Sequence, residues 1–332
     1  MAYQTGTATD SADLLDKLRA FLLANGWTIE AWRFRIAQPS WRWLAVSKSG
    51  FFFNFAVDLS AVSTRFPTNN HIRLKWATSY ASGSDFQSQP GGSGNGAGGD
   101  VLCGDIVGPY TAYHFFDGVG ASGPYAYAAV ELGAGEFRHF GVGVLDKVGT
   151  YSGGEFSFGT VWSAEGIAIS DWTNQAHQIA FDSSSSAGSI TQLATATSVR
   201  CVESQAGGEV VGYASAPVGR NLRCGGWQFH EGTAASTSRG GVGHEFYRAG
   251  PTLTVGLAPL IRVQCFAERG SGLHSMIGEP PAFRHIRMDA LNPGDEITLG
   301  TEVWKCFPYV RKGTTPLIRS SNNVGIAYRR TP

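Results

Sequence analysis

The sequence lacks a charge excess of either sign. Its 332 residues include 26 Lys and Arg and 26 Asp and Glu, and charged residues make up only 16% of the chain. A protein that binds nucleic acid or an anionic membrane surface normally carries a basic patch or a net positive charge. The charge balance therefore argues against nucleic acid as a partner.

Long hydrophobic runs are also missing. No apolar stretch approaches the roughly 18 to 20 residues that a membrane-spanning helix needs. The N-terminus is polar and rich in threonine, without the basic start and apolar core of a secretion signal. We therefore expect no membrane span and no export by the general secretion route.

Cysteine is scarce and scattered. The five cysteines are Cys103, Cys201, Cys224, Cys265 and Cys306. Their number is odd and no two form a C-x-x-C pair, so neither a zinc site nor a disulfide framework is indicated. We expect them to be small apolar fillers in a protein that assembles in a reducing cytosol.

Signatures of cofactor sites and of catalytic nucleophiles are absent as well. The closest pairs among the eight histidines are His230 with His244 and His274 with His285, which do not have the i, i+2 or i, i+4 spacing of metal ligands. No Gly-x-Ser-x-Gly motif occurs, and the glycine-rich segment 82–99 is not followed by the Lys-Ser or Lys-Thr of a phosphate-binding loop. We expect no cofactor and no bound metal.

Glycine and aromatic residues, in contrast, are abundant. The chain has 44 glycines and 12% aromatic residues, a composition that suits a loop-rich β protein. Strand-like segments alternate with glycine-rich turns along most of the chain. The sequence predicts a mainly β fold of antiparallel, sandwich-like sheets with one N-terminal amphipathic helix at about residues 11–24. A serine-rich break divides the chain into two expected lobes, 1–182 and 183–332, with a single domain as the alternative.

The predicted helix has a clear start, a clear end and one apolar face. Asp10 or Ser11 would cap its first turn, Asp13 would favour the positive end of the helix dipole, and Gly26 would end it. One apolar stripe forms its expected docking face: Leu14, Leu15, Leu18, Phe21 and Leu22. A short helix does not bury such a stripe alone, so the stripe must pack on the chain's own sheet or on another subunit.

Two further segments carry expectations about exposure. In the strand predicted at 71–76, the polar residues His71, Arg73 and Lys75 alternate with apolar ones, so this basic face is expected to be solvated. The segment 82–99 consists mainly of glycine and serine and has too few side chains to pack. It is expected to be a surface excursion, or an arm that becomes ordered only against a partner.

Four carboxylates lie on or near successive aromatic strands, where a sugar could stack: Glu131, Glu136, Asp146 and Glu155. A glycosidase needs two carboxylates that face each other across a cleft. Spacing in the sequence does not choose a pair among the four. A glycoside hydrolase is therefore kept only as an alternative class.

Aromatic residues are more numerous than one core requires, with nine tryptophans, eleven tyrosines and twenty phenylalanines. Those outside the core could stack on sugar rings in a lectin-like site or be buried between subunits. The near-zero net charge and the long loops favour subunit contact.

Several segments resemble structural proteins from the virions of tailed bacteriophages. They are MAYQTGTATD at 1–10, DLLDKL at 13–18, GW at 26–27, YHFF at 113–116, FRHFGVG at 137–143, WKCFP at 304–308 and NVGIAYRR at 323–330. The N-terminal segment is the most specific of them. Proteins of this kind are associated with the phage tail, and they offer no catalytic site to carry over.

The resemblance implies a non-enzymatic structural protein of a phage tail, at its tip, baseplate or fibre-attachment region. Such a protein is assembled in the host cytoplasm and resides in the virion. The implied partners are other copies of the chain, as a trimer or hexamer, other tail proteins, and a host-surface glycan. A carbohydrate-binding host-receptor module is the alternative, and a glycan depolymerase is the third class.

The helix pattern and the resemblance together give an expectation for the N-terminal segment. The strands between residues 27 and 57 would provide the surface on which the apolar stripe of the helix packs within the same chain. The polar leader, residues 1–9, would then reach outward to a neighbour. The expected subunit contacts are Met1, Tyr3, Gln4, Thr5 and Thr7.

Overall fold

The structure is a computed structural model. It describes residues 1–37, 39–59, 72–91, 101–103, 106, 108–133, 135–151, 153–160, 260–263, 265–268, 274–312 and 324–330, and the backbone of the strands at 189–194, 200–203, 210–212 and 222–224.

Four antiparallel sheets account for most of the described residues. The central sheet has the order β1 (Ala2–Ala8), β7 (Tyr110–Val119), β8 (Pro124–Gly133), β9 (Glu136–Val144), β11 (Glu155–Thr160), β12 (Ser189–Ala194), β13 (Arg200–Glu203) and β14 (Val210–Gly212). The N-terminal sheet has the order β2 (Thr28–Phe34), β3 (Trp41–Lys48), β4 (Phe51–Asp58), β5 (Ile72–Ala77) and β6 (Val101–Cys103).

Two smaller sheets follow. The C-terminal sheet has the order β16 (Ile261–Arg262), β19 (Phe283–Arg287), β22 (Val324–Arg329), β21 (Glu302–Pro308) and β20 (Glu296–Leu299). The fourth sheet has the order β10 (Asp146–Lys147), β18 (His274–Glu279), β17 (Cys265–Glu268) and β15 (Leu222–Cys224). The expected fold class, mainly β with antiparallel sheets and one helix, is confirmed.

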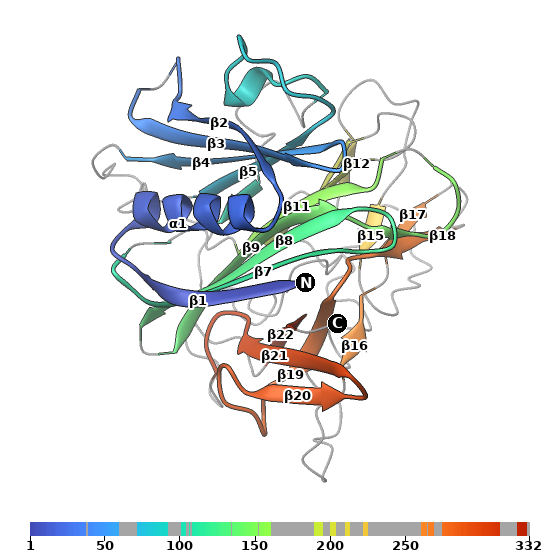
Figure 1. Cartoon of the computed structure of the whole chain (residues 1–332). Helices are drawn as coiled ribbons and strands as arrows, with labels where there is room; N and C mark the ends of the chain where they lie inside the picture. Colours follow the sequence, from blue (N-terminus) through green and yellow to red (C-terminus); the bar gives the residue numbers. More distant parts are fainter. Residues whose placement is uncertain are drawn as a thin grey trace.

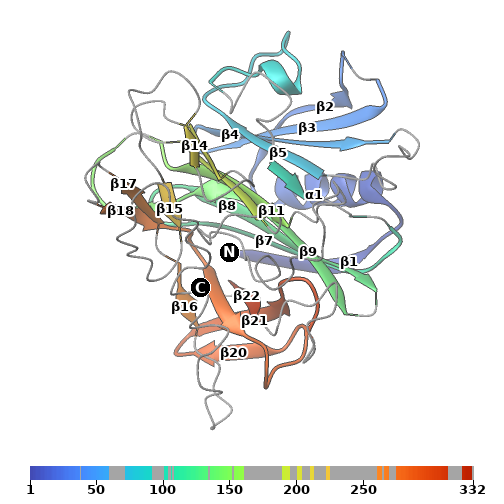
Figure 2. The same ribbon diagram turned by 180° about the vertical axis from the view of Figure 1, so that it is seen from behind.

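The central sheet lies between the other layers (Figure 1). One face packs on the N-terminal sheet and the helix, and the other packs on the C-terminal sheet, which Figure 2 shows from behind. Strand β8 shows the consequence, because its first seven residues are buried without interruption. A strand covered on both faces is apolar throughout instead of alternating.

The expected boundary between residues 182 and 183 lies outside the described residues. Side chains from both expected lobes nevertheless share one core cluster. Tyr127 of β8, for example, donates its hydroxyl hydrogen to the carbonyl oxygen of Pro281 at 2.8 Å and packs on Phe283.

Helix α1 (Ser11–Ala24) begins and ends with the residues expected from the sequence. The Asp10 carboxylate accepts hydrogen bonds from the backbone N–H groups of Ala12 and Asp13, both at 2.9 Å. After the helix the chain turns at Gly26, whose φ of +80° is in the left-handed region that glycine adopts without a steric penalty.

Replacing the cap residue should weaken this helix measurably. We expect Asp10→Ala to lower the free energy of unfolding by about 1 kcal/mol, since two backbone N–H groups lose their acceptor. Urea denaturation checks the value. The matched control is Asp16→Ala, which removes an exposed carboxylate from the same helix and should cost no more than about 0.5 kcal/mol. An equal loss in both variants would contradict the assigned role of Asp10.

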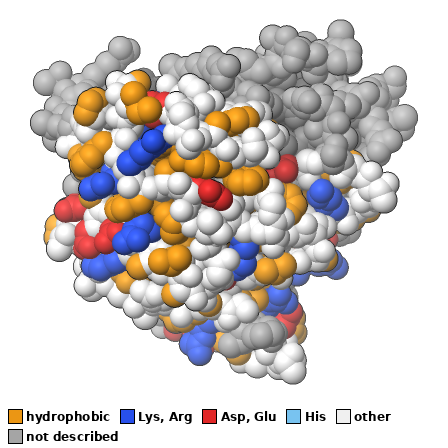
Figure 3. Space-filling view, turned by 45° about the horizontal axis from the view of Figure 1, so that its top comes forward, with side chains coloured by type: hydrophobic (Ala, Val, Ile, Leu, Met, Phe, Trp, Pro, Cys, Tyr) orange, Lys and Arg blue, Asp and Glu red, His pale blue; other side chains and the backbone are white. Residues whose placement is uncertain are grey.

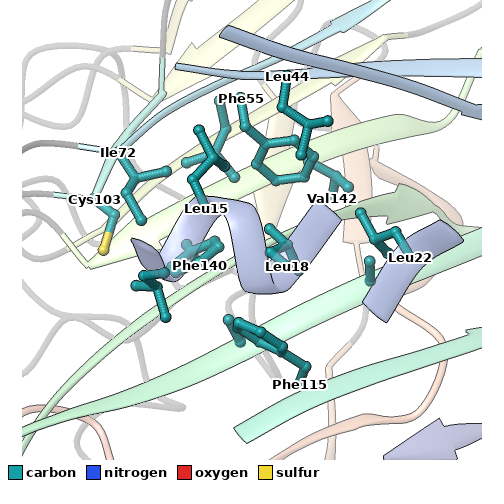
Figure 4. Packing of buried hydrophobic residues seen from close by; sticks show 14 of the residues in the cluster. Leu15, Leu18, Leu22, Leu44, Phe55, Ile72, Cys103, Phe115, Phe140 and Val142 are labelled. Carbon is teal, nitrogen blue, oxygen red and sulfur yellow. The ribbon is translucent and has the colours of Figure 1, made fainter. Parts of the chain in front are cut away.

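The apolar face of α1 fills the space between the N-terminal and central sheets (Figure 4). All five side chains expected on its docking face are buried: Leu14, Leu15, Leu18, Phe21 and Leu22. They pack on more than the strands at 27–57, because Phe21 also contacts Phe115 of β7, with ring centroids 5.7 Å apart. The helix therefore connects two layers of the fold.

A buried ion pair fixes the end of α1 to the central sheet. The Lys48 ammonium group lies 3.2 Å from the Asp117 carboxylate and donates to the carbonyl oxygen of Asn25 at 2.9 Å. The indole N–H of Trp27 donates to the same carboxylate at 2.5 Å. Burial raises the pKa of Asp117, and the hydrogen bonds from Trp27 and Lys48 oppose that shift.

Two expectations about exposure are wrong in part; His71 and residues 92–99, to which they also apply, lie outside the described residues. Lys75 of the predicted solvated face is fully buried, and its ammonium group donates to the carbonyl oxygen of Gln87 at 2.9 Å. The covering residues come from the segment 82–99, whose described part, 82–91, packs on this face with Phe86 fully buried. The local pattern identified two faces of a strand but not the distant segment that covers one of them.

Candidate functional site

The N-terminal residues form the edge of the central sheet. The expectation that residues 1–9 reach outward is wrong, because β1 pairs with β7 in antiparallel register from Ala2 opposite Asp117 to Ala8 opposite Tyr110. The physical reason lies in the residues themselves. Tyr and Thr favour strands, and β7 offers an open row of backbone hydrogen-bonding groups.

The expected contact residues divide between the interior and the surface. The Tyr3 hydroxyl lies 2.8 Å from Nδ1 of His114, and the Tyr3 ring packs on Phe116. Gln4 is exposed and donates to the hydroxyl of Tyr113 at 3.1 Å. The other three, Met1, Thr5 and Thr7, are exposed as well.

Strand β1 lacks the usual protection of an edge strand. Natural edges are commonly blocked by charged side chains or proline, because unpaired backbone groups otherwise bind another strand. The other seven-residue edge strand of the fold, β2, contains Glu30 and Arg33, whereas β1 has no charged residue and no proline. Among the described residues, Lys17 covers the C-terminal part of β1, because it donates to the carbonyl oxygen of Thr7 at 2.7 Å, and the register with β7 is irregular between Gly6 and Ala8. Lys305 and Arg330 lie 5.8 and 5.5 Å from the ring centre of Tyr3 in the N-terminal part.

The four carboxylates considered for glycoside hydrolysis lie in two separate places. Glu131 and Glu136 lie near the turn between β8 and β9, whereas Glu155 pairs with the last residue of β9 and Asp146 follows soon after that residue. Nine residues of strand separate the two places by about 26 Å at roughly 3.3 Å per residue. A catalytic pair requires about 5 to 9.5 Å, so no pair drawn from both places is suitable.

Each pair within one place contains a carboxylate that is already engaged. Glu136 forms an ion pair with Arg138 at 2.7 Å, and Asp146 accepts from the backbone N–H of Ala121 at 2.5 Å. Glu155 differs, because its Oε2 atom is buried and has no hydrogen-bond partner among the described residues. Burial raises the pKa of Glu155.

Two histidines are part of the core between the central and C-terminal sheets. His139 is fully buried, with Nε2 at 2.9 Å from the carbonyl oxygen of Pro308 and Nδ1 at 3.0 Å from the hydroxyl of Tyr328. Since a carbonyl only accepts, Nε2 carries the proton and Nδ1 accepts from Tyr328. Burial lowers the pKa of His139 to about 4, and it lowers the pKa of His114 to about 4 as well.

The thiols that the structure describes are structural. Cys103, Cys265 and Cys306 are buried and form no disulfide among the described residues, and burial raises the pKa of Cys306 to about 12. A high pKa disfavours the thiolate and with it the reactivity of a cysteine. Within the described ranges, no cluster of His, Cys, Asp or Glu has the composition of a metal site.

The most distinctive surface feature is a stack of alternating guanidinium groups and aromatic rings, which we call the Arg42 stack: Arg19, Trp32, Arg42 and Phe34. The guanidinium carbon of Arg42 lies 4.8 Å from the ring centre of Trp32 and 4.1 Å from that of Phe34. Arg19 lies over Trp32 at 5.2 Å. Cations are attracted to the faces of aromatic rings at such distances.

Strand register builds this stack. Trp32 and Phe34 are two residues apart on β2 and therefore lie on the same face, and Arg42 of β3 is directly opposite Phe34. Arg19 comes from α1 and forms an ion pair with Asp16 at 2.7 Å. No hydrogen bond or ion pair joins Arg42 to another described residue, so none of its five N–H donors is engaged within the described part of the chain.

The elements that form the Arg42 stack, and the residues next to them in the chain, also carry exposed apolar side chains. Phe34 is 47% exposed, Ile36 is 65% exposed and Leu23 of α1 is 54% exposed. Figure 3 shows one face of the molecule, on which hydrophobic side chains lie next to Lys and Arg side chains and acidic ones. Aromatic residues and arginine with an apolar surround are typical of the energetically important centres of protein interfaces.

The sequence contained a signal for this stack that composition alone did not reveal. The segments Trp32-Arg33-Phe34 and Trp41-Arg42-Trp43 each place an arginine between two aromatic residues. Alternation assigns the neighbours of an arginine to the opposite face of its own strand. Only the pairing of β2 with β3 brings Arg42 between Trp32 and Phe34.

No known protein family and no curated protein matches the chain. Among the helices of the described residues, none is long and apolar enough to cross a membrane.

Proposed function

We propose that the protein is a non-enzymatic structural component of a bacteriophage tail that acts by self-association and by contact with other tail proteins. The observation that carries this proposal is the unprotected edge strand β1 of the central sheet. The N-terminal resemblance to virion proteins of tailed phages supports it independently. Trimeric or hexameric symmetry, matching that of a tail, belongs to the same proposal.

The mode of association follows from the free edge. A strand of a second chain that aligns with residues 2–6, ahead of the covered C-terminal part of β1, would satisfy the unpaired backbone groups there and extend the eight-stranded sheet. Exposed Gln4 and Thr5 would lie at this interface, while Tyr3 stays packed on its own domain. This arrangement replaces the outward-reaching leader with an edge-to-edge contact.

A lysine on the edge should separate the subunits. We expect the unmodified protein to be oligomeric in light scattering coupled to size exclusion, and Thr5→Lys to raise the subunit dissociation constant at least about tenfold, because a charged side chain disfavours strand addition. The control is Thr111→Lys, which places the same charge at an exposed position of β7, a strand with neighbours on both sides. The thermal midpoints of both variants confirm that they fold.

Two results would contradict the proposal. One is a protein that stays monomeric at high concentration and is absent, by mass spectrometry, from purified virions of the phage that encodes it. The other is an equal increase of the subunit dissociation constant in Thr5→Lys and Thr111→Lys, because self-association would then not depend on the edge of β1. Localisation of the chain in a virion image distinguishes tip, baseplate and fibre attachment.

A further inference from the structure

We propose that the Arg42 stack is a binding site for an acidic polypeptide segment of a partner protein, in which a carboxylate precedes an aromatic or apolar residue. This inference names the chemistry of a second contact surface, and it rests on the structure of the N-terminal sheet rather than on the edge of β1. Its failure would therefore leave the proposed self-association unaffected.

The opposite face of the same sheet shows what such a site binds. Arg35 lies over the ring of Trp41 at 4.6 Å and over that of Phe86 at 5.4 Å. Its Nε and Nη2 groups donate to the two carboxylate oxygens of Asp85 at 3.1 to 3.3 Å. Within this chain, an arginine between two rings thus binds a carboxylate through a fork of two donors.

The two arginines differ in what covers them. Residues 82–91 of the chain cover Arg35 and supply Asp85 and Phe86. Burial alone would raise the pKa of Asp85, but hydrogen bonds from Arg35 and from the backbone of Phe86 hold it below its usual value. Arg42 lies between two rings in the same way but has no carboxylate among the described residues. A partner segment would supply that carboxylate.

The surroundings of Arg42 favour a peptide over a sugar. Leu23, Phe34 and Ile36 offer apolar surface and no hydrogen-bonding side chain, which matches the apolar or aromatic residue of a peptide. The planar guanidinium group, already fixed between two rings, loses little conformational entropy when it binds a planar carboxylate.

The chain itself provides the probe. We use a blocked synthetic peptide with the sequence of residues 82–88, Ser-Gly-Ser-Asp-Phe-Gln-Ser, and measure its binding by saturation-transfer NMR at 150 mM salt. The native copy of this segment already occupies its own site on Arg35, so the free peptide reports on a second site. We expect weak, saturable binding that falls at least about tenfold when the peptide Asp is replaced by Asn.

Variants of the protein locate the site. Arg42→Gln should weaken binding at least about tenfold, and Arg42→Lys should not restore it, because an ammonium group lacks the planar fork. Arg262→Gln, which removes an exposed arginine from the C-terminal sheet, should leave binding unchanged. Thr5→Lys should also bind the peptide normally, which separates this site from the edge of β1.

Three outcomes would overturn the inference. The first is the absence of peptide binding, and the second is equal binding by the unmodified protein and Arg42→Gln. The third is binding of polygalacturonate that depends on Arg42, without binding of the peptide, because that result would assign the stack to acidic polysaccharides.

Discussion

Lys48→Met should destabilise the protein by about 3 to 5 kcal/mol at pH 7, the largest effect expected from a single substitution considered for this chain. The substitution leaves the buried Asp117 carboxylate without its cation, while the indole of Trp27 remains as its hydrogen-bond donor. Urea denaturation at pH 7 measures the loss. At lower pH the loss should shrink, because the unpaired carboxyl group is then protonated.

A second variant distinguishes the effect of the unpaired Asp117 charge on stability from the effect of lost packing. Lys48→Met combined with Asp117→Asn removes both charges and keeps an oxygen acceptor for Trp27, so it should be more stable than Lys48→Met alone. Lys17→Met removes a lysine from a half-exposed pair with Asp13 and should cost less than about 1 kcal/mol. If the double variant were no more stable than the single one, the charge would not be the cause.

Acid should destabilise the protein through His139. Its pKa is about 4 in the folded state and about 6.5 in an unfolded chain, so the unfolded state binds the proton first as pH falls. The contribution of His139 is therefore complete above pH 6.5 and is lost between about pH 6.5 and 4. Its full size is about 3 kcal/mol.

The comparison with His139→Gln isolates this contribution. The free energy of unfolding should fall less steeply between pH 7.5 and 4 in the variant than in the unmodified protein, because glutamine does not titrate. Asp117 and Glu155, whose pKa values are raised by burial, act in the opposite direction, but they do so in both proteins. If the free energy of unfolding fell equally with pH in the unmodified protein and in His139→Gln, the pKa of His139 would not be lowered in the folded state.

Local periodicity and capping chemistry predicted the elements well. The helix at 11–24 was predictable because its cap, its apolar stripe and its terminal glycine all lie within one short segment. Lys75 was not predictable, because its burial depends on the packing of residues 82–91 onto β5. A sequence pattern specifies which side chains share a face, whereas burial also depends on what covers that face.

The candidate sites also depend on long-range pairing that a local sequence pattern does not specify. Thr5 and its neighbours were predicted to be contact residues, but their place on a sheet edge depends on a pairing with β7 more than 100 residues away. The Arg42 stack required the register of β2 against β3, which no single segment contains. Asp85 at Arg35 is likewise a long-range partner, 50 positions along the chain.

The two-sided central sheet also imposes an order on folding during synthesis. The helix, the N-terminal sheet and the strands β7 to β9 supply nearly all of the first core cluster, so that cluster can form early. Phe116 and Tyr127 face the other way and pack on Tyr328 and Phe283, which the ribosome adds more than 150 residues later. Until then the nascent chain presents an aromatic surface to solvent, so its yield should depend on chaperones and on slow translation of the intervening segment.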